Sequence, residues 1–352
     1  MSDPRRAQIQ PDARILLVRL SAIGDIVFAS PLISALRRAC PEAHIAWLVQ
    51  PECSALLDHH PDLDETLCCP LGHWRRLWRE RRLSELAAGI RTLRQTLKLR
   101  QFDLALDLQG LLKSGLLTRL SGAPARIGLG SREGSQWLMT RTLSRGGDPR
   151  RIGSEYLYLA EQLGLPTDPF TMAVQYSPAD AAFAQETAVR ERLTGGYAVL
   201  CPFTTRPQKH WFEERWAALA NRLGSELGLV PVLLGGPADQ EAATRIGDQT
   251  ECRLVNLAGR TSLTEAAALI DGAELLVAVD TGLGHMGIAF GTPSLLLFGS
   301  TRPYLDTTRA NARVLYHPLP CSPCKRRPTC GGAFTCMREI QVGEVLTAAR
   351  DL

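Results

Sequence analysis

Residues 16–32, LLVRLSAIGDIVFASPL, join an apolar run to a segment that holds a single carboxylate. The run over residues 15–20 is rich in leucine and isoleucine, which is typical of a buried strand. Asp25 follows a glycine at the point where that run has ended, and we expect the next helix to begin near Ala29. The stretch therefore predicts a strand, a loop with one acid and a helix, the repeating unit of an α/β protein.

Short apolar runs of the same kind recur along the chain with helical patterns between them. They cover residues 44–49, 103–108, 197–201, 230–234, 275–279 and 294–298. Such alternation predicts parallel sheets with helices on both faces. With 352 residues the chain is long enough for about two domains, and residues 164–178, GLPTDPFTMAVQYSP, carry three prolines. We expect domains at 1–175 and 176–352, with ligands in a cleft between them at the carboxyl ends of the strands.

Composition and charge argue against several classes of protein. The longest stretch without charged residues, 281–301, contains a proline and five glycines, so we expect a buried helix and strand rather than a membrane span. The N-terminus has no apolar core of the secretory kind, which favours a cytosolic location. The net charge of +4 is too small to indicate a nucleic-acid coat.

The densest charge feature is residues 74–82, WRRLWRERR, with five arginines, one glutamate and two tryptophans. One interpretation is an amphipathic basic helix that faces solvent. The other is that the arginines bind phosphates or carboxylates of an anionic acceptor while the tryptophans rest against sugar or lipid. Nucleic acid would use the same chemistry, but the patch is one short segment in a nearly neutral chain.

Three motifs have the character of anion or substrate sites. Residues 202–211, PFTTRPQKHW, follow a predicted strand and suit a phosphate or pyrophosphate, although a polar surface loop would look the same. Residues 280–285, DTGLGH, place an acid and a histidine at a helix start, where glycines allow a ligand close to the backbone; a capped core helix is the alternative. Residues 107–114, DLQGLLKS, repeat this arrangement in the first half, for a substrate or for a helix cap. The GxG at 282–284 lacks the dinucleotide fingerprint, which argues against a nicotinamide dehydrogenase.

Taken together and in order, these motifs and the GGPADQE stretch at 235–241 resemble glycosyltransferase family 9, the bacterial ADP-heptose:lipopolysaccharide heptosyltransferases. The basic segment lies where type I members have their acceptor segment. The resemblance implies a GT-B architecture, with two Rossmann-like domains facing across a cleft. The N-terminal half would bind the acceptor and the C-terminal half the nucleotide sugar. The reaction would move heptose from ADP-L-glycero-D-manno-heptose to a Kdo residue of the lipopolysaccharide inner core. It would invert the anomeric centre without a cofactor or catalytic metal.

The resemblance also implies a role for each matching residue. Asp25, on the loop after the first strand, would be the base that deprotonates the attacking hydroxyl. Lys209 would offset the charge on the departing ADP. The implied donor residues are Thr204, Thr205, Lys209, Asp239, Asp280, Thr281, Gly282 and His285. The implied acceptor residues are Gly24, Arg75, Arg76, Arg79, Gln109 and Lys113. With Kdo-lipid A as acceptor, the enzyme would work peripherally at the cytoplasmic face of the inner membrane, without nucleic acid.

Two features depart from this pattern or leave it open. Residues 299–303 are GSTRP where the family often has GPTDP, so Arg302 replaces an acid. Four cysteines, at 321, 324, 330 and 336, could bind a structural metal, pack as reduced thiols or form disulfides. The rival functions are a type II enzyme or another family member with a different acceptor. Outside enzymes, the rival is a nucleotide-sugar- or nucleic-acid-binding protein with a four-cysteine metal site.

Overall fold

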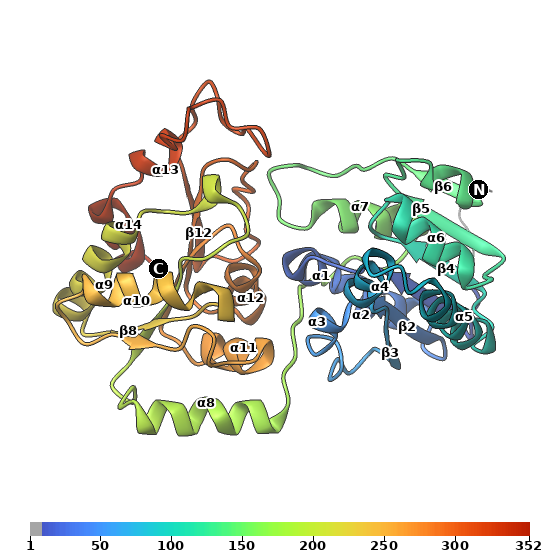
Figure 1. The fold of residues 1–352 in the computed structure, drawn as a ribbon, viewed down its shortest axis with the longest axis horizontal. Helices are drawn as coiled ribbons and strands as arrows, with labels where there is room; N and C mark the ends of the chain where they lie inside the picture. The colour runs from blue at the N-terminus through green and yellow to red at the C-terminus, as the bar shows by residue number, and fades with distance from the viewer. Residues whose placement is uncertain (1–8) are drawn as a thin grey trace. The chain divides into compact units, whose positions relative to one another are not determined.

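The computed structural model describes residues 9–352, which form two compact units (Figure 1). The first unit contains the chain up to Asp148 together with Gly153–Ala173. The second contains Pro149–Ile152 and Val174–Leu352. The short segment Pro149–Ile152 belongs to the second unit because Arg151 forms a parallel bridge with Asp306.

The first unit is built on a six-stranded parallel sheet in the order β3-β2-β1-β4-β5-β6. Its strands are β1 (Arg14–Val18), β2 (His44–Val49), β3 (Glu65–Cys68), β4 (Leu104–Asp107), β5 (Ala125–Leu129) and β6 (Arg141–Leu143). Its helices are α1 (Ile23–Ala29), α2 (Pro31–Ala39), α3 (Pro51–Ser54), α4 (Leu71–Arg79), α5 (Leu83–Leu99), α6 (Leu112–Leu120), the 3-10 turn η1 (Ser135–Leu138) and α7 (Ser154–Leu163). Separate apolar clusters form along the sheet, and successive residues of β1 alternate between them, so helices cover both faces.

The second unit has another six-stranded parallel sheet, in the order β12-β11-β10-β7-β8-β9. Its strands are β7 (Tyr197–Cys201), β8 (Val230–Leu233), β9 (Val255–Asn256), β10 (Leu275–Val279), β11 (Ser294–Phe298) and β12 (Ala312–Tyr316). Its helices are α8 (Pro178–Arg190), the 3-10 turns η2 (Pro207–Lys209) and η3 (Pro237–Asp239), α9 (Glu213–Leu227), α10 (Gln240–Asp248), α11 (Leu263–Asp271), α12 (Gly282–Phe290), α13 (Thr335–Glu339) and α14 (Val342–Arg350). Here too two apolar clusters cover opposite faces, and α8 packs on α11 (Figure 1).

Both sheets have the strand order of a Rossmann fold. Counted from the first strand of each unit, the order is 3-2-1-4-5-6 in both. The direction of winding therefore reverses between β1 and β4 in the first unit and between β7 and β10 in the second. Ligands of open parallel sheets bind at such switch points, beyond the carboxyl ends of the strands. This topology confirms the α/β class and the two Rossmann-like parallel sheets that the sequence predicts.

The seven predicted strands are all present, and four of them have the predicted bounds. The predicted runs at 15–20, 103–108 and 230–234 are one or two residues too long at an end. The sequence did not predict β3, β5, β6, β9 or β12. Most of these strands are short or carry exposed and half-buried residues, so their apolar signal is weak.

One predicted helix position is wrong. α1 begins at Ile23 rather than near Ala29, so Asp25 lies in the first turn of a helix and not on a loop. The helix through the basic segment ends at Arg79, and Arg81 turns the chain with a positive φ of 57° before α5 begins. The predicted helix and strand within residues 281–301 are confirmed as α12 and β11, both largely buried. Within residues 9–352, no helix has the length and apolar character needed to cross a bilayer.

Gly110 shows how the sheet fixes the loop after β4. Its φ is +68°, and a Cβ atom there would lie 2.5 Å from the carbonyl oxygen of Leu129. We expect Gly110→Ala to lower the free energy of unfolding by more than about 2 kcal/mol, because both the left-handed backbone and the clash oppose a side chain. Urea denaturation measures this loss. Gly195→Ala is the control, because no neighbouring atom lies within 4 Å of a Cβ atom there; similar losses in both variants would contradict the explanation.

Candidate functional site

Asp25 lies in the first turn of α1, directly after β1 and the loop that leaves it. Its Oδ2 atom accepts a hydrogen bond from the backbone N–H of Ala22 at 3.2 Å and forms an ion pair with Arg19. The side chain of Asp25 is 39% exposed, whereas that of Arg19 is 6% exposed. A nearly buried cation thus holds one oxygen of a carboxylate that remains accessible to solvent.

Hydrogen bonds hold both the side chain and the backbone of Arg19 in place. Its Nη1 donates to the carbonyl oxygen of Leu108 at 3.0 Å, and its backbone carbonyl accepts from the indole N–H of Trp47 at 3.0 Å. Burial would lower the pKa of Arg19, but the neighbouring Tyr156 and Asp25 outweigh it and the pKa is raised. Arg19 therefore keeps its positive charge, and its ion pair with Asp25 fixes the orientation of that carboxylate.

The loop after β4 lies beside the loop after β1. The Gln109 side-chain oxygen accepts from the backbone N–H of Leu20 at 3.2 Å, and Asp107 accepts from the N–H groups of Gln109 and Gly110 at 3.0 Å each. Burial raises the pKa of Asp107 despite these hydrogen bonds. Gln109 is itself 6% exposed, so in this structure its amide joins the two loops at the switch point.

Lys113 lies at the start of α6 and is half-buried. Burial lowers its pKa, and the positive charges of Arg75 and Arg19 lower it further. Lys113 on α6 is therefore within electrostatic range of Arg75 on α4 and of Arg19 after β1. Gly24, the second residue of α1, immediately precedes Asp25. The candidate acceptor side is thus a cationic region around the Asp25 carboxylate.

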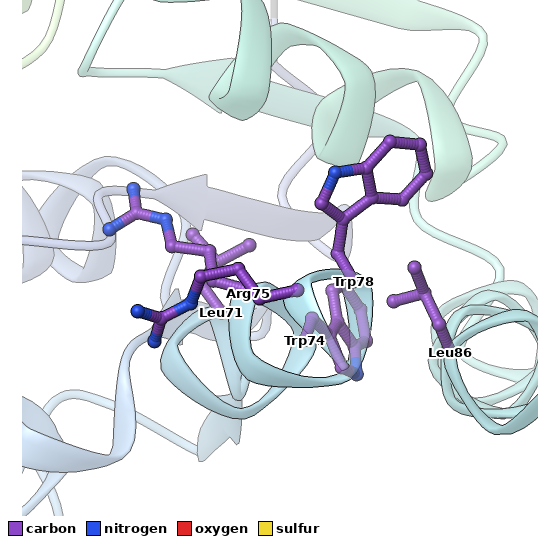
Figure 2. Close-up of a pocket in the computed structure, with 6 residues that line it drawn as sticks. Leu71, Trp74, Arg75, Trp78 and Leu86 are labelled. Atoms are coloured by element: carbon purple, nitrogen blue, oxygen red, sulfur yellow. The ribbon is translucent and has the colours of Figure 1, made fainter. Parts of the chain in front are cut away.

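The three arginines of α4 are exposed. Arg76 is 4.0 Å from Glu80, whereas Arg75 and Arg79 line a pocket of about 590 Å³. Figure 2 shows this pocket, whose other lining residues are Leu71, Trp74, Trp78 and Leu86. Trp74 and Leu77 are the buried residues of α4, so the apolar face packs inward and the arginines face out. The predicted amphipathic helix is confirmed, and its arginines are available to an anion.

In the second unit, Lys209 and Asp280 form a nearly buried ion pair. Lys209 ends the turn η2 after β7, and Asp280 follows β10, so the pair spans the switch point of this sheet. The Lys209 Nζ lies 2.7 Å from the Asp280 Oδ2, and each side chain is 15% exposed. The hydroxyl of Thr301 donates to the same oxygen at 2.6 Å. Residues far apart in the sequence thus converge on one carboxylate.

The other oxygen of Asp280 faces a histidine. His285 Nε2, in the first turn and a half of α12, is 3.4 Å from Asp280 Oδ1, and Tyr304 Oη is 2.7 Å from His285 Nδ1. Burial raises the pKa of Tyr304 well above its usual value, so its hydroxyl stays protonated beside Nδ1. Burial would raise the pKa of Asp280, but the hydrogen bond from His285 and the charge of Lys209 outweigh it, so the pKa is lowered.

The remaining predicted donor residues surround this network. Thr204 and Thr205 lie on the loop between β7 and Lys209, and His210 fixes that loop by donating to the Thr204 carbonyl at 2.7 Å. Thr281 and Gly282 begin α12 beside Asp280. Gly284 packs against the sheet, because a Cβ atom there would lie 3.0 Å from that of Ala278. The tight packing of the helix on the sheet thus explains a glycine at this position.

Asp239 lies farther along the same edge of the sheet. It ends the turn η3 after β8, and its carboxylate accepts from the Gly236 N–H at 2.8 Å. Arg302 is exposed beside Thr301. All ten cysteines are free thiols, Cys321 exposed and Cys336 buried among them. Among the described residues, no group of three or more His, Cys, Asp and Glu side chains could hold a metal ion.

Sequence reasoning missed Arg19, Thr301 and Tyr304. Arg19 stands in the quoted opening motif, where an arginine at the end of an apolar strand was a signal. Thr301 and Tyr304 lie in the segment after β11, on either side of Arg302. Their contacts with Asp280 and His285 are tertiary and have no spacing in the sequence that would indicate them.

The Tyr304 contact can be tested by removing one oxygen. We expect Tyr304→Phe to weaken binding of the donor nucleotide sugar about threefold to tenfold, because His285 loses the bond that orients it toward Asp280. Titration calorimetry with the donor measures the change. The matched control is Tyr197→Phe, which removes a buried hydroxyl that donates to the Leu269 carbonyl at 2.7 Å. Equal donor affinity in wild type and Tyr304→Phe would contradict this role.

Comparison with known proteins identifies the family of this chain. Residues 90–333 match glycosyltransferase family 9 (heptosyltransferase). The chain is 32% identical over 324 residues to lipopolysaccharide heptosyltransferase 1 of Pseudomonas aeruginosa, covering 90% of this chain and 87% of that protein. It is 29% identical to lipopolysaccharide heptosyltransferase 2 of Escherichia coli, over 86% and 87% of the two chains.

A solved structure agrees with this assignment. The Escherichia coli heptosyltransferase WaaC with ADP has a TM-score of 0.74 at 25% identity, over 96% of this chain and 99% of that one. The likeness covers nearly the whole chain and therefore includes residues of both units. The chain is a glycosyltransferase and belongs to glycosyltransferase family 9, the heptosyltransferases.

Proposed function

We propose that this enzyme transfers heptose from ADP-L-glycero-D-manno-heptose to a Kdo residue of the lipopolysaccharide inner core, as a type I heptosyltransferase. The observation that carries the proposal is the Lys209–Asp280–His285 network at the switch point of the second sheet. It offers a cation for a diphosphate beside a carboxylate for sugar hydroxyls. The 32% identity to a protein named heptosyltransferase 1 supports the choice of subgroup.

On the donor side, Lys209 acts on the diphosphate. Charge builds up on the ADP oxygens as the glycosidic bond breaks, and a positioned ammonium stabilises that charge in the transition state. Thr204 and Thr205 hydrogen-bond the phosphates. Asp280 accepts hydrogen bonds from heptose hydroxyls, while Lys209, Thr301 and His285 keep its carboxylate ionised and oriented.

The rest of the donor has partners at the same edge of the sheet. Thr281, Gly282 and His285 border the sugar, because they form the start of α12 beside Asp280. Asp239 binds the ribose hydroxyls. With Asp239 already accepting from the Gly236 N–H, one carboxylate oxygen is held and the other serves the ligand.

On the acceptor side, Asp25 acts as the general base. Both contacts of its carboxylate use Oδ2, so Oδ1 is the oxygen that we assign to the attacking hydroxyl. Proton removal on the face opposite the departing ADP gives inversion in one displacement. Arg19 is a positioning residue in this step, because it holds the base without contacting the substrate.

The acceptor is anionic, and the cations around Asp25 suit it. Lys113 and Gln109 bind the Kdo carboxylate or hydroxyls, and Gly24 leaves room for the sugar beside Asp25. Arg75, Arg76 and Arg79 bind acidic groups farther along the acceptor, where a guanidinium can form paired hydrogen bonds with phosphate. We place the enzyme in the cytoplasm, peripheral to the inner membrane that holds its lipid A acceptor.

Acceptor choice distinguishes type I from type II enzymes. ADP release is measured with ADP-heptose and either Kdo-lipid A or the same acceptor already carrying one heptose. A type I enzyme responds to the first and not to the second. Release that requires the heptosylated acceptor would instead assign the chain to type II, the function named for the 29% identical relative.

A further inference from the structure

The exposed large apolar side chains are concentrated in the first unit. Trp137 is 85% exposed and Trp78 is 66% exposed, while Leu112 and Leu116 are each more than two-fifths exposed. We call these four residues the tryptophan face. Large exposed indole rings and leucines are unusual on a protein surface and mark interaction sites when they cluster.

The α6 part of the tryptophan face is continuous with η1. Leu112 approaches Gly134, and Gly115 packs so tightly on η1 that a Cβ atom there would lie 2.8 Å from the Ser135 Cβ. Leu112 and Leu116 are four residues apart and therefore share one side of α6. The exposed Trp137 is on η1, between Ser135 and Leu138, which both approach Gly115 of α6.

Trp78 lies on α4, where it lines a pocket together with Arg75 and Arg79. Arg75, one turn before Trp78 on α4, acts electrostatically on Lys113, the neighbour of Leu112 on α6. Figure 2 shows Trp78 extending from α4 beside the pocket that it helps to line. The face therefore combines exposed apolar groups with nearby cations from two helices.

The surrounding segment is strongly basic. Residues 71–141 contain fourteen Lys and Arg against five Asp and Glu, whereas the whole chain has a net charge of only +4. The segment therefore has a net positive charge, whereas the rest of the chain, with 26 Lys and Arg against 31 Asp and Glu, has a net negative charge. A surface of this kind is electrostatically complementary to an anionic partner.

We propose that the tryptophan face docks the first unit on an anionic lipid bilayer. Tryptophan favours the boundary between headgroups and acyl chains because its ring is apolar and its N–H can hydrogen-bond. Leucines next to it enter the same boundary, and the cations meet lipid phosphates. This inference deepens the peripheral membrane association that the proposed function contains, since it names the surface and the lipid charge.

Nucleic acid is the competing anionic partner, and the side chains favour lipid. A nucleic-acid surface uses arginine and lysine for phosphates and aromatic rings for stacking. Leu112 and Leu116 have no place in such an interface, whereas they add apolar area that a bilayer can bury. A duplex of DNA is therefore the comparison ligand in the test.

The test is co-sedimentation of the full-length enzyme with vesicles that contain no lipopolysaccharide. The probe vesicles are phosphatidylethanolamine with phosphatidylglycerol, and phosphatidylcholine vesicles are the neutral reference. We expect binding to the anionic vesicles that weakens as salt rises, because salt screens surface charge. The double variant Leu116→Ser/Trp137→Ser should need at least about tenfold more lipid for half-maximal binding, because both side chains lose their buried apolar area.

The matched control is Val189→Ser/Leu305→Ser, which removes two exposed apolar side chains of the second unit. It should bind vesicles like the wild type. Both double variants should keep wild-type ADP release with a water-soluble, deacylated acceptor, so that failure of docking is distinguishable from failure of sugar transfer. Equal vesicle binding by Leu116→Ser/Trp137→Ser and wild type would overturn the proposal. So would a wild type that ignores anionic vesicles but binds the duplex.

Discussion

Asp25→Asn should lower kcat by at least about 100-fold while the affinity for ADP-heptose stays within about twofold of wild type. The amide cannot accept the proton of the attacking hydroxyl, and a general base typically contributes 10²- to 10⁴-fold. Donor affinity is retained because the donor residues belong to the second sheet, after β7 and β10. Steady-state ADP release gives kcat, and titration with the donor alone gives the affinity.

The control for this variant is Asp180→Asn. Asp180 has the same place in α8 that Asp25 has in α1, because it accepts from the backbone N–H three residues earlier, that of Ser177, at 2.8 Å. Any loss that comes only from weakening a helix N-terminus should appear in both variants. A loss of less than about tenfold in Asp25→Asn, or an equal loss in both, would contradict its role as the base.

Lys209→Met should damage both donor binding and the chemical step. The variant keeps the length and apolar stem of the side chain but removes the ammonium that lies 2.7 Å from Asp280. We expect the KM for ADP-heptose to rise about tenfold and kcat to fall about 100-fold, since removal of one group that stabilises transition-state charge typically costs that much. The variant also leaves Asp280 without the cation of Lys209. Repulsion between the Asp280 carboxylate and the donor diphosphate then weakens donor binding further.

Lys325→Met is the matched control for charge. Lys325 is exposed, and only its backbone carbonyl contacts the η2 turn, through a hydrogen bond from the Gln208 side chain at 2.8 Å. The substitution lowers the net charge equally and preserves that backbone contact. Steady-state kinetics with varied donor distinguish the two variants. Wild-type KM and kcat in Lys209→Met would remove this lysine from the phosphate site.

The sequence predicted the sheets well because parallel strands buried on both faces are continuous apolar runs. The four strands with the predicted bounds, β2, β7, β10 and β11, are nearly or fully buried along their length. The start of α1 was not predictable in the same way. Its N-cap is Ala22, which has no side chain that could cap a helix, so the usual Ser, Thr, Asp or Asn signal is missing.

The positions of the site motifs on the sheets could be predicted, but their contacts could not. The motifs around Asp25, Lys209 and Asp280 each follow a strand, and this placement indicated the edge of each sheet on which they lie. The contacts of Arg19 with Asp25, of Thr301 with Asp280 and of Tyr304 with His285 could not be predicted, because they form only when the chain folds. The tryptophan face could not be predicted either, because only the structure shows that Trp137 is exposed while Trp74 is buried.

The most direct test of the central claim is to follow both products of one reaction. The enzyme is incubated with ADP-heptose and Kdo-lipid A, ADP is quantified, and the lipid is analysed by mass spectrometry. The account predicts one heptose added per acceptor, with one ADP released for each addition and almost no release when the acceptor is omitted. Release of ADP without a heptosylated lipid, or at the same rate without acceptor, would contradict it.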